Sequence, residues 1–315
     1  MDSFAGRLAV VTGGGSGIGR ELVVQLAAEG CSVAACDLNG AALSETKERA
    51  ETGAPAGTRI TTHICDVADE EQVAAFGDEV LAQHGTDHVN LVFANAGIAG
   101  GGSFVTGKRD EWERTFGVCW GGVYNCARTF VPLLVASDEG YLINTSSVNG
   151  FWASLGPGMP HTAYSTAKFA VKGFSEALLE DFRLNSPHVK VAVVMPGHIG
   201  TDIVTNTRLA HGSDPDAMTP EELAEVRSMM ARRGIPADGV ADADLQQMVK
   251  ALGEVFRENA PTSAAQAATT ILDGVRAGEW RILVGDDAFA LDTAVRADPH
   301  KAYGPEGLTF GTLGV

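Results

Sequence analysis

The chain has 315 residues, and its 23 Lys and Arg against 40 Asp and Glu give a net charge of −17 at pH 7. Binding to nucleic acid or to an anionic membrane surface needs clustered cations, so this charge argues against both function classes. Apolar residues make up 45% of the chain and charged residues 20%, which is typical of a folded globular protein.

The first residues contain an acid and soon reach a glycine cluster, so we expect no secretory signal. No run of about 18 uncharged apolar residues predicts a membrane span. The cysteines lie mostly within apolar patterns and have no CxxC spacing: Cys31, Cys36, Cys65, Cys119 and Cys126. We therefore expect reduced core thiols, a cytoplasmic location and neither a disulfide framework nor a metal site.

Short apolar runs alternate with longer amphipathic segments over the first 200 residues. The predicted strands are residues 7–12, 31–36, 59–64, 89–94, 140–145 and 189–195. The predicted helices are residues 17–29, 41–51, 70–84, 110–136 and 162–185. This alternation indicates right-handed βαβ crossovers, so we expect an α/β, Rossmann-like, doubly wound parallel sheet in a three-layer α/β/α arrangement.

The remainder of the chain departs from this alternation. Residues 202–262 are acidic and helix-prone with several prolines, and they are followed by a predicted helix at 263–277 and a strand at 281–284. The segment 285–315 is rich in Asp, Pro and Gly, and we expect it to wrap the surface or a neighbouring subunit. With no repeat and no linker, we expect one domain over 1–315.

The motif TGGGSGIG directly follows the first strand and opens the first helix. In that context Gly13, Gly17 and Gly19 would allow a tight turn, close approach to a pyrophosphate and packing of helix against strand. Ser16 and Ile18 belong to the same candidate cofactor loop. The N–H groups and the dipole of the helix would face the phosphates, whereas a glycine-rich loop without a ligand is the less favoured alternative.

Asp37 closes the second predicted strand, 18 residues after Gly19. A carboxylate at this position accepts hydrogen bonds from adenosine ribose hydroxyls and repels a 2′-phosphate. Leu38 and Asn39 carry no positive charge, and we expect Arg20 to point away from the ribose. The sequence therefore favours NAD over NADP as the cofactor, and a simple helix N-cap is the alternative role for Asp37.

Tyr164 and Lys168 are four residues apart at the start of a long predicted helix, so they share one face. A neighbouring ammonium and an oxidised nicotinamide would lower the phenol pKa from its usual value near 10. Such a pair taken alone is better explained by a solvated helix face. However, the segment INTSSVNG brings Ser147 to the carboxyl edge of the sheet, where open α/β sheets bind ligands, while Ser146 is expected to face backbone.

Together these motifs resemble the short-chain dehydrogenase/reductase family over about residues 5–202. The resemblance implies three further groups of cofactor contacts. Asp66 and Val67 would contact the adenine, and the segment that holds the nicotinamide amide would be Pro196, Gly197, Ile199 and Thr201. The third group follows the fourth strand and consists of Asn95, Ala96 and Gly97. The resemblance also implies that Tyr164 exchanges a proton, that Ser147 orients the substrate oxygen, and that Lys168 holds the nicotinamide ribose and tunes Tyr164.

We accordingly expect an NAD-dependent alcohol dehydrogenase or ketone reductase for secondary alcohols with an apolar body, assembled as a homotetramer or homodimer. Two alternatives remain. One is a catalytically impaired NAD-binding sensor, and the other is an isomerase or lyase of the epimerase or dehydratase branch. The TGxxxGxG spacing disfavours that branch, which usually has TGxxGxxG.

Cys119 is the first departure from the family pattern, because it occupies a position that commonly carries an asparagine credited with holding a proton-relaying water. A thiol is a weak donor and acceptor, and Asn125 is too far along the helix to substitute. The cysteine is tolerated, slows turnover, or is a redox-sensitive thiol, in decreasing order of preference.

Two segments near the presumed pocket are also unusual. The stretch between Ser147 and Tyr164 is long, and its Phe151, Trp152, Leu155 and Met159 either line a pocket wall or pack on their own subunit. Residues 202–262 lie where related enzymes keep a substrate lid. Their helical stripe is more often core than ligand wall: Leu223, Val226, Met229 and Met230. His161 and His198 flank the pocket, and we interpret both as satisfied loop histidines.

Overall fold

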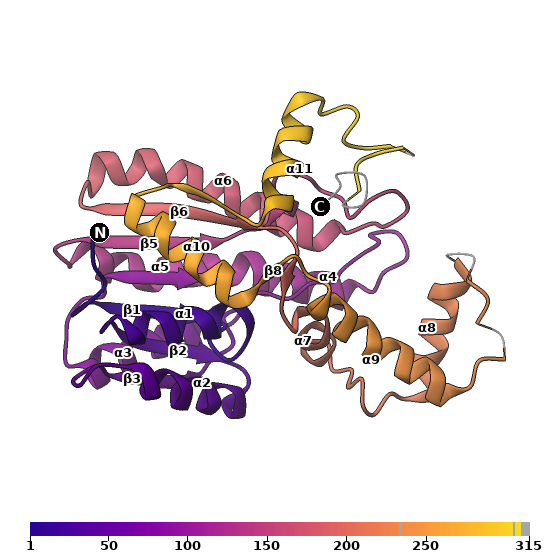
Figure 1. The fold of residues 1–315 in the computed structure, drawn as a ribbon, viewed down its shortest axis with the longest axis horizontal. Coiled ribbons are helices and arrows are strands. Elements are labelled where there is room, and N and C mark those ends of the chain that lie inside the picture. Colours follow the sequence, from indigo (N-terminus) through magenta and orange to yellow (C-terminus); the bar gives the residue numbers. More distant parts are fainter. Residues whose placement is uncertain (233–234, 238, 305, 310–315) are drawn as a thin grey trace.

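The computed structural model describes residues 1–232, 235–237, 239–304 and 306–309. Within these ranges, seven parallel strands form one sheet in the order β3-β2-β1-β4-β5-β6-β9 (Figure 1). The strands are β1 (Leu8–Thr12), β2 (Ser32–Asp37), β3 (Ile60–Ile64), β4 (Leu91–Ala94), β5 (Gly140–Thr145), β6 (Val189–Pro196) and β9 (Arg281–Val284). The strand order reverses between β1 and β4, which is where doubly wound sheets bind ligands. The predicted Rossmann-like fold is confirmed.

Helices cover both faces of the sheet, as Figure 1 shows. One apolar core lies under α1 (Gly17–Ala28), α2 (Gly40–Gly53) and α10 (Ala264–Ala277). The other lies under α3 (Glu70–His84), α5 (Gly122–Val135) and α6 (Thr162–Asn185). Adjacent strand residues such as Val10 and Val11 enter opposite cores, so a central strand such as β1 is mostly apolar and does not alternate with polar residues.

The predicted helix over 110–136 is interrupted near its middle. It consists of α4 (Arg109–Phe116), a π-helical turn (Gly117–Gly121) and α5. A π-helical turn inserts one residue into the helical repeat and rotates the side chains that follow, and such turns are often found at functional sites. Cys119 lies at the centre of this turn.

The insertion forms a helical arm that projects from the body of the molecule (Figure 1). It contains α7 (Ile203–Ala210), α8 (Pro220–Arg232) and α9 (Asp242–Glu258). The chain enters and leaves it through two paired strands, β7 (Ile199–Gly200) and β8 (Thr262–Ser263). The arm has a small core of its own, made by Met218, Leu223, Val226, Leu245 and Val249. The prediction that the stripe in this insertion is core is confirmed for Leu223 and Val226.

The C-terminal segment begins with a helix that packs on the sheet. Its first part is α11 (Asp286–Ala297), whose Ala288 and Leu291 are buried against Val193 and Met195 of β6. It therefore packs on its own chain, which agrees with the first of the two alternatives expected for this segment, and its helical structure was not predicted. Among the described helices, none is long and apolar enough to cross a membrane.

Candidate active site

The loop between β1 and α1 is packed tightly enough to require glycine. Gly13 has a φ of 68°, a left-handed conformation that favours glycine. A Cβ on Gly19 would overlap the carbonyl group of Gly13. Among the described residues, Ser16 makes no side-chain cap at the start of α1, and the first turn of this helix contains no acid. The first N–H groups of α1 thus remain available to an anion such as a phosphate.

The other two residues of this loop have local contacts. Ile18 packs against the core beneath α1, so its side chain supports the loop. Ser16 Oγ accepts a hydrogen bond from Asn206 Nδ2 at 3.0 Å. Asn206 lies on α7 of the insertion, and the sequence contained no motif that would have indicated its contact with this loop.

The Asp37 carboxylate lies against the glycine-rich loop. Its oxygens accept hydrogen bonds from the backbone N–H groups of Gly15 and Asn39, both at 3.0 Å. The N-cap of α2 is Asn39, so the alternative in which Asp37 is that cap was wrong. Arg20 donates a hydrogen bond to Gly15 O at 2.6 Å and forms an ion pair with Glu45 at 3.0 Å. Both contacts use the guanidinium group of Arg20.

The segment after β3 is held in place by two long-range contacts. Arg114 pairs with the Asp66 carboxylate at 2.7 Å. Asn125 Nδ2 donates to Val67 O at 2.9 Å. Asn125 therefore supports the loop predicted to contact adenine, in agreement with the inference that it does not replace the missing asparagine.

The residues after β4 are fastened to the end of β1. Thr12 Oγ1 accepts hydrogen bonds from the N–H groups of Asn95 and Ala96, both at 3.0 Å. The next residue, Gly97, faces Lys168, because a Cβ built on it would lie 3.4 Å from Lys168 Nζ. These contacts join the cofactor loop to the side chains predicted to be catalytic.

Ser147, Tyr164 and Lys168 come together at the carboxyl edge of the sheet. Ser147 begins a short 3-10 turn (Val148–Gly150), and its hydroxyl interacts by hydrogen bonding with Tyr164. Lys168 is buried, with Nζ 5.4 Å from the centre of the Tyr164 ring, and it donates to Thr145 O at 2.9 Å. Ser146 Oγ donates to Lys168 O, so its predicted backbone-facing role is confirmed.

Burial shifts the ionisation of both helix residues toward their neutral forms. It raises the pKa of Tyr164 above its usual value, and the hydrogen bond from Ser147 opposes this rise. It also lowers the pKa of Lys168. A positive charge brought in beside the phenol would stabilise its phenolate.

Cys119 is fully enclosed beside this group. Its Sγ donates a hydrogen bond to Ile98 O at 3.0 Å. A Cβ on Gly97 would lie 3.8 Å from this sulfur and 3.4 Å from Lys168 Nζ, so the thiol and the ammonium border the same small space. The thiol of Cys119 therefore uses its proton in a hydrogen bond to the backbone carbonyl group of Ile98.

The two histidines differ from each other. His198 Nε2 is hydrogen-bonded to Phe256 O at 2.7 Å, as expected of a satisfied histidine. His161 instead stacks on the Tyr164 ring with centroids 4.7 Å apart, and its buried Nδ1 has no partner among the described residues. Burial lowers the pKa of His161 to about 4, so the ring against the phenol is neutral at pH 7.

The segment predicted to hold the nicotinamide begins at the end of β6. Gly197 N donates to Val284 O at 2.9 Å, and Ile199 pairs with Thr262 in the small sheet. Thr201 touches the glycine-rich loop, since a Cβ on Gly17 would lie 3.0 Å from Thr201 Cγ2. The predicted nicotinamide segment therefore lies beside the loop predicted to bind the pyrophosphate.

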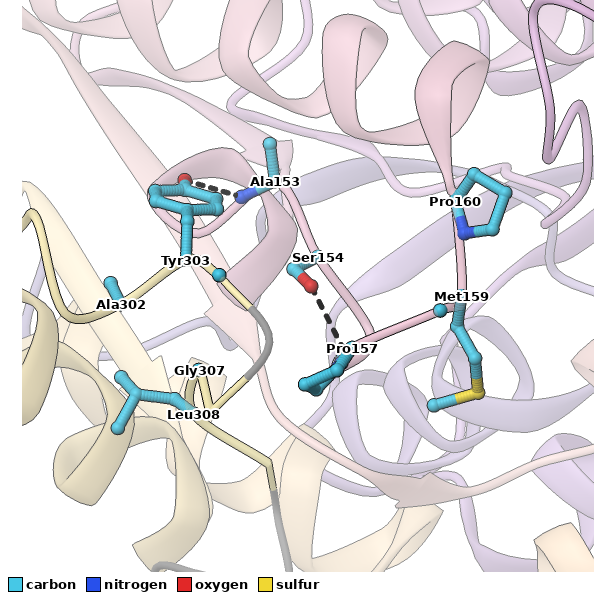
Figure 2. A pocket seen from close by; sticks show the side chains of 12 residues that line it. Ala153, Ser154, Pro157, Met159, Pro160, Ala302, Tyr303, Gly307 and Leu308 are labelled. Carbon is cyan, nitrogen blue, oxygen red and sulfur yellow. Dashed lines mark hydrogen bonds between the residues drawn. The ribbon is translucent and has the colours of Figure 1, made fainter.

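A cavity of about 370 Å³ lies between the loop that precedes α6 and the C-terminal segment (Figure 2). Met159 and Leu308 line it, and the Tyr303 hydroxyl accepts a hydrogen bond from Ala153 N at 2.9 Å across it. Trp152 is fully buried below the loop and donates to Ala302 O. The hypothesis that Trp152 lines a pocket wall was wrong, because its side chain is part of the hydrophobic core.

In the part of the chain that the structure describes, no group of side chains is arranged to hold a metal ion.

Comparison with known proteins identifies the family. The sequence model described as short chain dehydrogenase matches residues 7–212. The chain belongs to this family. An oxidoreductase named SadH from Mycobacterium tuberculosis is 34% identical over 297 residues, which are 94% of this chain and 92% of that protein. This chain is accordingly an oxidoreductase of the short-chain dehydrogenase family.

Solved structures agree with the fold. A short-chain dehydrogenase/reductase from Burkholderia phymatum in complex with NAD matches 97% of this chain and 98% of its own, with a TM-score of 0.74 at 24% identity. A metagenomic short-chain oxidoreductase in complex with NADP matches 82% of this chain and 96% of its own, with a TM-score of 0.54 at 24% identity. Both share the architecture of the short-chain dehydrogenase described here.

Proposed function

We propose that this short-chain dehydrogenase is NAD-dependent and interconverts secondary alcohols and ketones, with Tyr164 as the acid/base. The observation that carries the proposal is the cluster at the carboxyl edge of the sheet. There the partly buried Tyr164 is hydrogen-bonded to Ser147, and the centre of its ring lies 5.4 Å from Lys168 Nζ. This combination suits proton exchange with a hydroxyl group, since it contains both a donor that orients oxygen and a cation that stabilises phenolate.

The residues present fit a dinucleotide. The uncapped start of α1 suits a pyrophosphate, and the glycines pack so closely that no side chain would obstruct it. Asp37 is positioned for the adenosine ribose, Asp66 and Val67 for the adenine, and the segment from Pro196 to Thr201 for the nicotinamide. The nicotinamide ring supplies the hydride acceptor in oxidation and the hydride donor in reduction.

In alcohol oxidation the residues of this chain handle the proton. Ser147 holds the substrate oxygen by a hydrogen bond, and the Tyr164 phenolate accepts the hydroxyl proton as the carbonyl forms. Lys168 stabilises the phenolate and binds the nicotinamide ribose. Reduction runs these roles in reverse, with Tyr164 donating the proton to the new alcohol oxygen.

Two features support NAD over NADP. The Asp37 carboxylate would repel a 2′-phosphate. Arg20, the cation next to the loop, is paired with Glu45 and bonded to Gly15 O. Its charge is therefore partly offset before any cofactor binds.

An apolar substrate body and an oligomeric enzyme complete the proposal. Met159 and Leu308, which line the cavity before α6, favour an apolar substrate. Apolar side chains exposed on α5 and α6 favour a homodimer or homotetramer: Tyr124, Val135, Phe169 and Leu184. Five cysteines without a disulfide are compatible with a cytoplasmic enzyme.

A non-catalytic NAD sensor is the second candidate, and Cys119 is the observation that favours it. A weakly hydrogen-bonding thiol in place of the relay asparagine would slow proton exchange with solvent. The assembled Ser147, Tyr164 and Lys168 favour the enzyme.

The test follows reduced-nicotinamide absorbance with NAD or NADP against short aliphatic, aryl and steroid secondary alcohols. We expect turnover with NAD, and we expect Tyr164→Phe to reduce kcat by about 10²- to 10⁴-fold, the usual contribution of general acid–base catalysis. The Phe variant keeps the ring and loses only the hydroxyl. Full turnover in this variant would remove Tyr164 from its role, and tighter binding of NADP would refute the role of Asp37. Binding of NAD without turnover of any alcohol would favour the sensor.

A further inference from the structure

A carboxylate from outside the matched family region lies against the proposed nicotinamide segment. Asp287 is in the first turn of α11 and only 1% exposed. Its Oδ2 accepts a hydrogen bond from the backbone N–H of His198 at 2.6 Å, and its Oδ1 accepts one from Ala288 N at 3.0 Å. The residue thus joins the C-terminal helix to the segment from Pro196 to Thr201.

The space around this carboxylate is closely fitted. A Cβ added to Gly197 would overlap the Asp287 carboxyl group, and so would a Cβ added to Gly285. The backbone at Gly197 therefore lies so close to the carboxylate that only glycine, which has no side chain, fits at this position. A displacement of Asp287 would leave the N–H of His198 without its acceptor.

His198 is also held from the opposite direction. Its Nε2 donates to Phe256 O near the end of α9, and its ring lies 4.2 Å from the Phe256 ring. The main chain of His198 is thus held by α11 and its side chain by the insertion. These contacts specify one position for the backbone at this point.

We infer that Asp287 is a positioning residue for the nicotinamide half of the cofactor. It fixes the backbone at Gly197 and His198 by a hydrogen bond from an N–H to a charged carboxylate, which is stronger than one between neutral groups. The inference rests on the proposed function, because it assigns the segment from Pro196 to Thr201 to the nicotinamide.

The role of Asp287 can be tested separately from binding of the adenosine half of the cofactor, because the two sites lie on different parts of the sheet. Of the candidate adenosine contacts, Asp37 ends β2 and Asp66 follows β3, and both strands lie on the other side of β1 from β6 and β9. A local change at Asp287 should therefore affect NAD and leave ADP-ribose, which has no nicotinamide, nearly unchanged.

The experiment titrates the full chain with NAD and with ADP-ribose by calorimetry. We expect Asp287→Ala to weaken NAD binding by about tenfold or more, the loss typical of a buried hydrogen bond to a charged group. Asp287→Asn should weaken it less, because the amide oxygen remains an acceptor. In both variants, binding of ADP-ribose should stay within about twofold of the wild type.

Asp286→Asn is the matched control, since Asp286 precedes Asp287 in the same helical turn but is exposed. It removes the same charge from the helix terminus, so unchanged NAD binding in this variant excludes a general helix-dipole effect. If Asp287→Ala fails to fold, the milder Asn variant carries the test.

If the Asp287 variants bind NAD as tightly as the wild type does, the inference is wrong but the proposed function stands. The same holds if they lose equal affinity for NAD and for ADP-ribose. A wild-type protein that binds neither ligand would refute the proposed function, and with it this inference.

Discussion

At the scale of single residues, the proposed chemistry depends on ionisation that burial opposes. Enclosure favours a neutral Tyr164 and a neutral Lys168. The hydrogen bond from Ser147 acts in the other direction on Tyr164, by stabilising the phenolate. A bound oxidised nicotinamide would add a positive charge beside the phenol. In the proposed mechanism, the bound cofactor and Ser147 would therefore together activate Tyr164.

Ser147→Ala tests this balance through the pH dependence of alcohol oxidation. Oxidation needs the deprotonated phenol, so its rate should rise with pH through the pKa of Tyr164. Loss of the Ser147 hydrogen bond raises that pKa, so the rising limb should move to higher pH, and kcat should fall by about 10²-fold. The measurement is kcat/KM against pH at saturating NAD. A limb that stays in place would show that Ser147 does not act on the Tyr164 ionisation.

The sequence predicted most candidate site residues because each lies in a local motif. Gly13 follows a strand and precedes a helix, and Asp37 ends a strand. Tyr164 and Lys168 are four residues apart, about one turn of a helix. Their functional roles remain predictions, although the structure brings the residues together. Asp287 had no such motif, since its partner His198 is 89 residues away and its contact appears only after folding.

At the scale of elements, the strands and the main helices were predictable from apolar runs and helical periodicity. The helix α11 was missed because Asp and Gly before it resemble a loop, although Ala288, Leu291 and Val295 follow one helical face. The π-helical turn around Cys119 was also missed. Nothing in the local sequence distinguishes such a turn from a continuous helix.

The helical arm is the element we expect to open most readily. Helices α8 and α9 pack around a small core, and Met248, Leu252 and Val255 of α9 are exposed. Local unfolding free energy is lowest where buried apolar contact is least. Hydrogen exchange should therefore be faster in α8 and α9 than in β1, β4 and β5.

Mass spectrometry on peptides from these elements measures the difference, and α6 provides the reference for a helix packed on the sheet. Equal protection of α9 and α6 would contradict this expectation. It would indicate that the arm is stabilised by a contact beyond its own core.

At the scale of the whole molecule, the thiols report on global unfolding. All five cysteines are buried and free. Burial raises the pKa of Cys31 and that of Cys126 to about 12. At pH 8 roughly one in ten thousand of such thiols is ionised, and the thiolate is the reactive form.

We therefore expect a disulfide reagent to modify Cys31 and Cys126 only as the protein unfolds. The rate should increase with urea in step with the loss of tryptophan fluorescence. Peptide mapping identifies the modified cysteines, and the fully denatured chain is the control for complete reaction. Rapid modification of either residue without urea would contradict their burial in the two cores.

The pairing of β6 with β9 has a consequence for synthesis on the ribosome. Val193–Pro196 pair with Arg281–Val284, so β6 has an open hydrogen-bonding edge until the later strand emerges. His198 and Asp287 are 89 positions apart, a distance that takes roughly 4 to 18 seconds to translate at 5 to 20 residues per second. During this time the nascent sheet exposes an edge of the kind that pairs with other chains. In the same interval the backbone at His198 lacks its contact with Asp287.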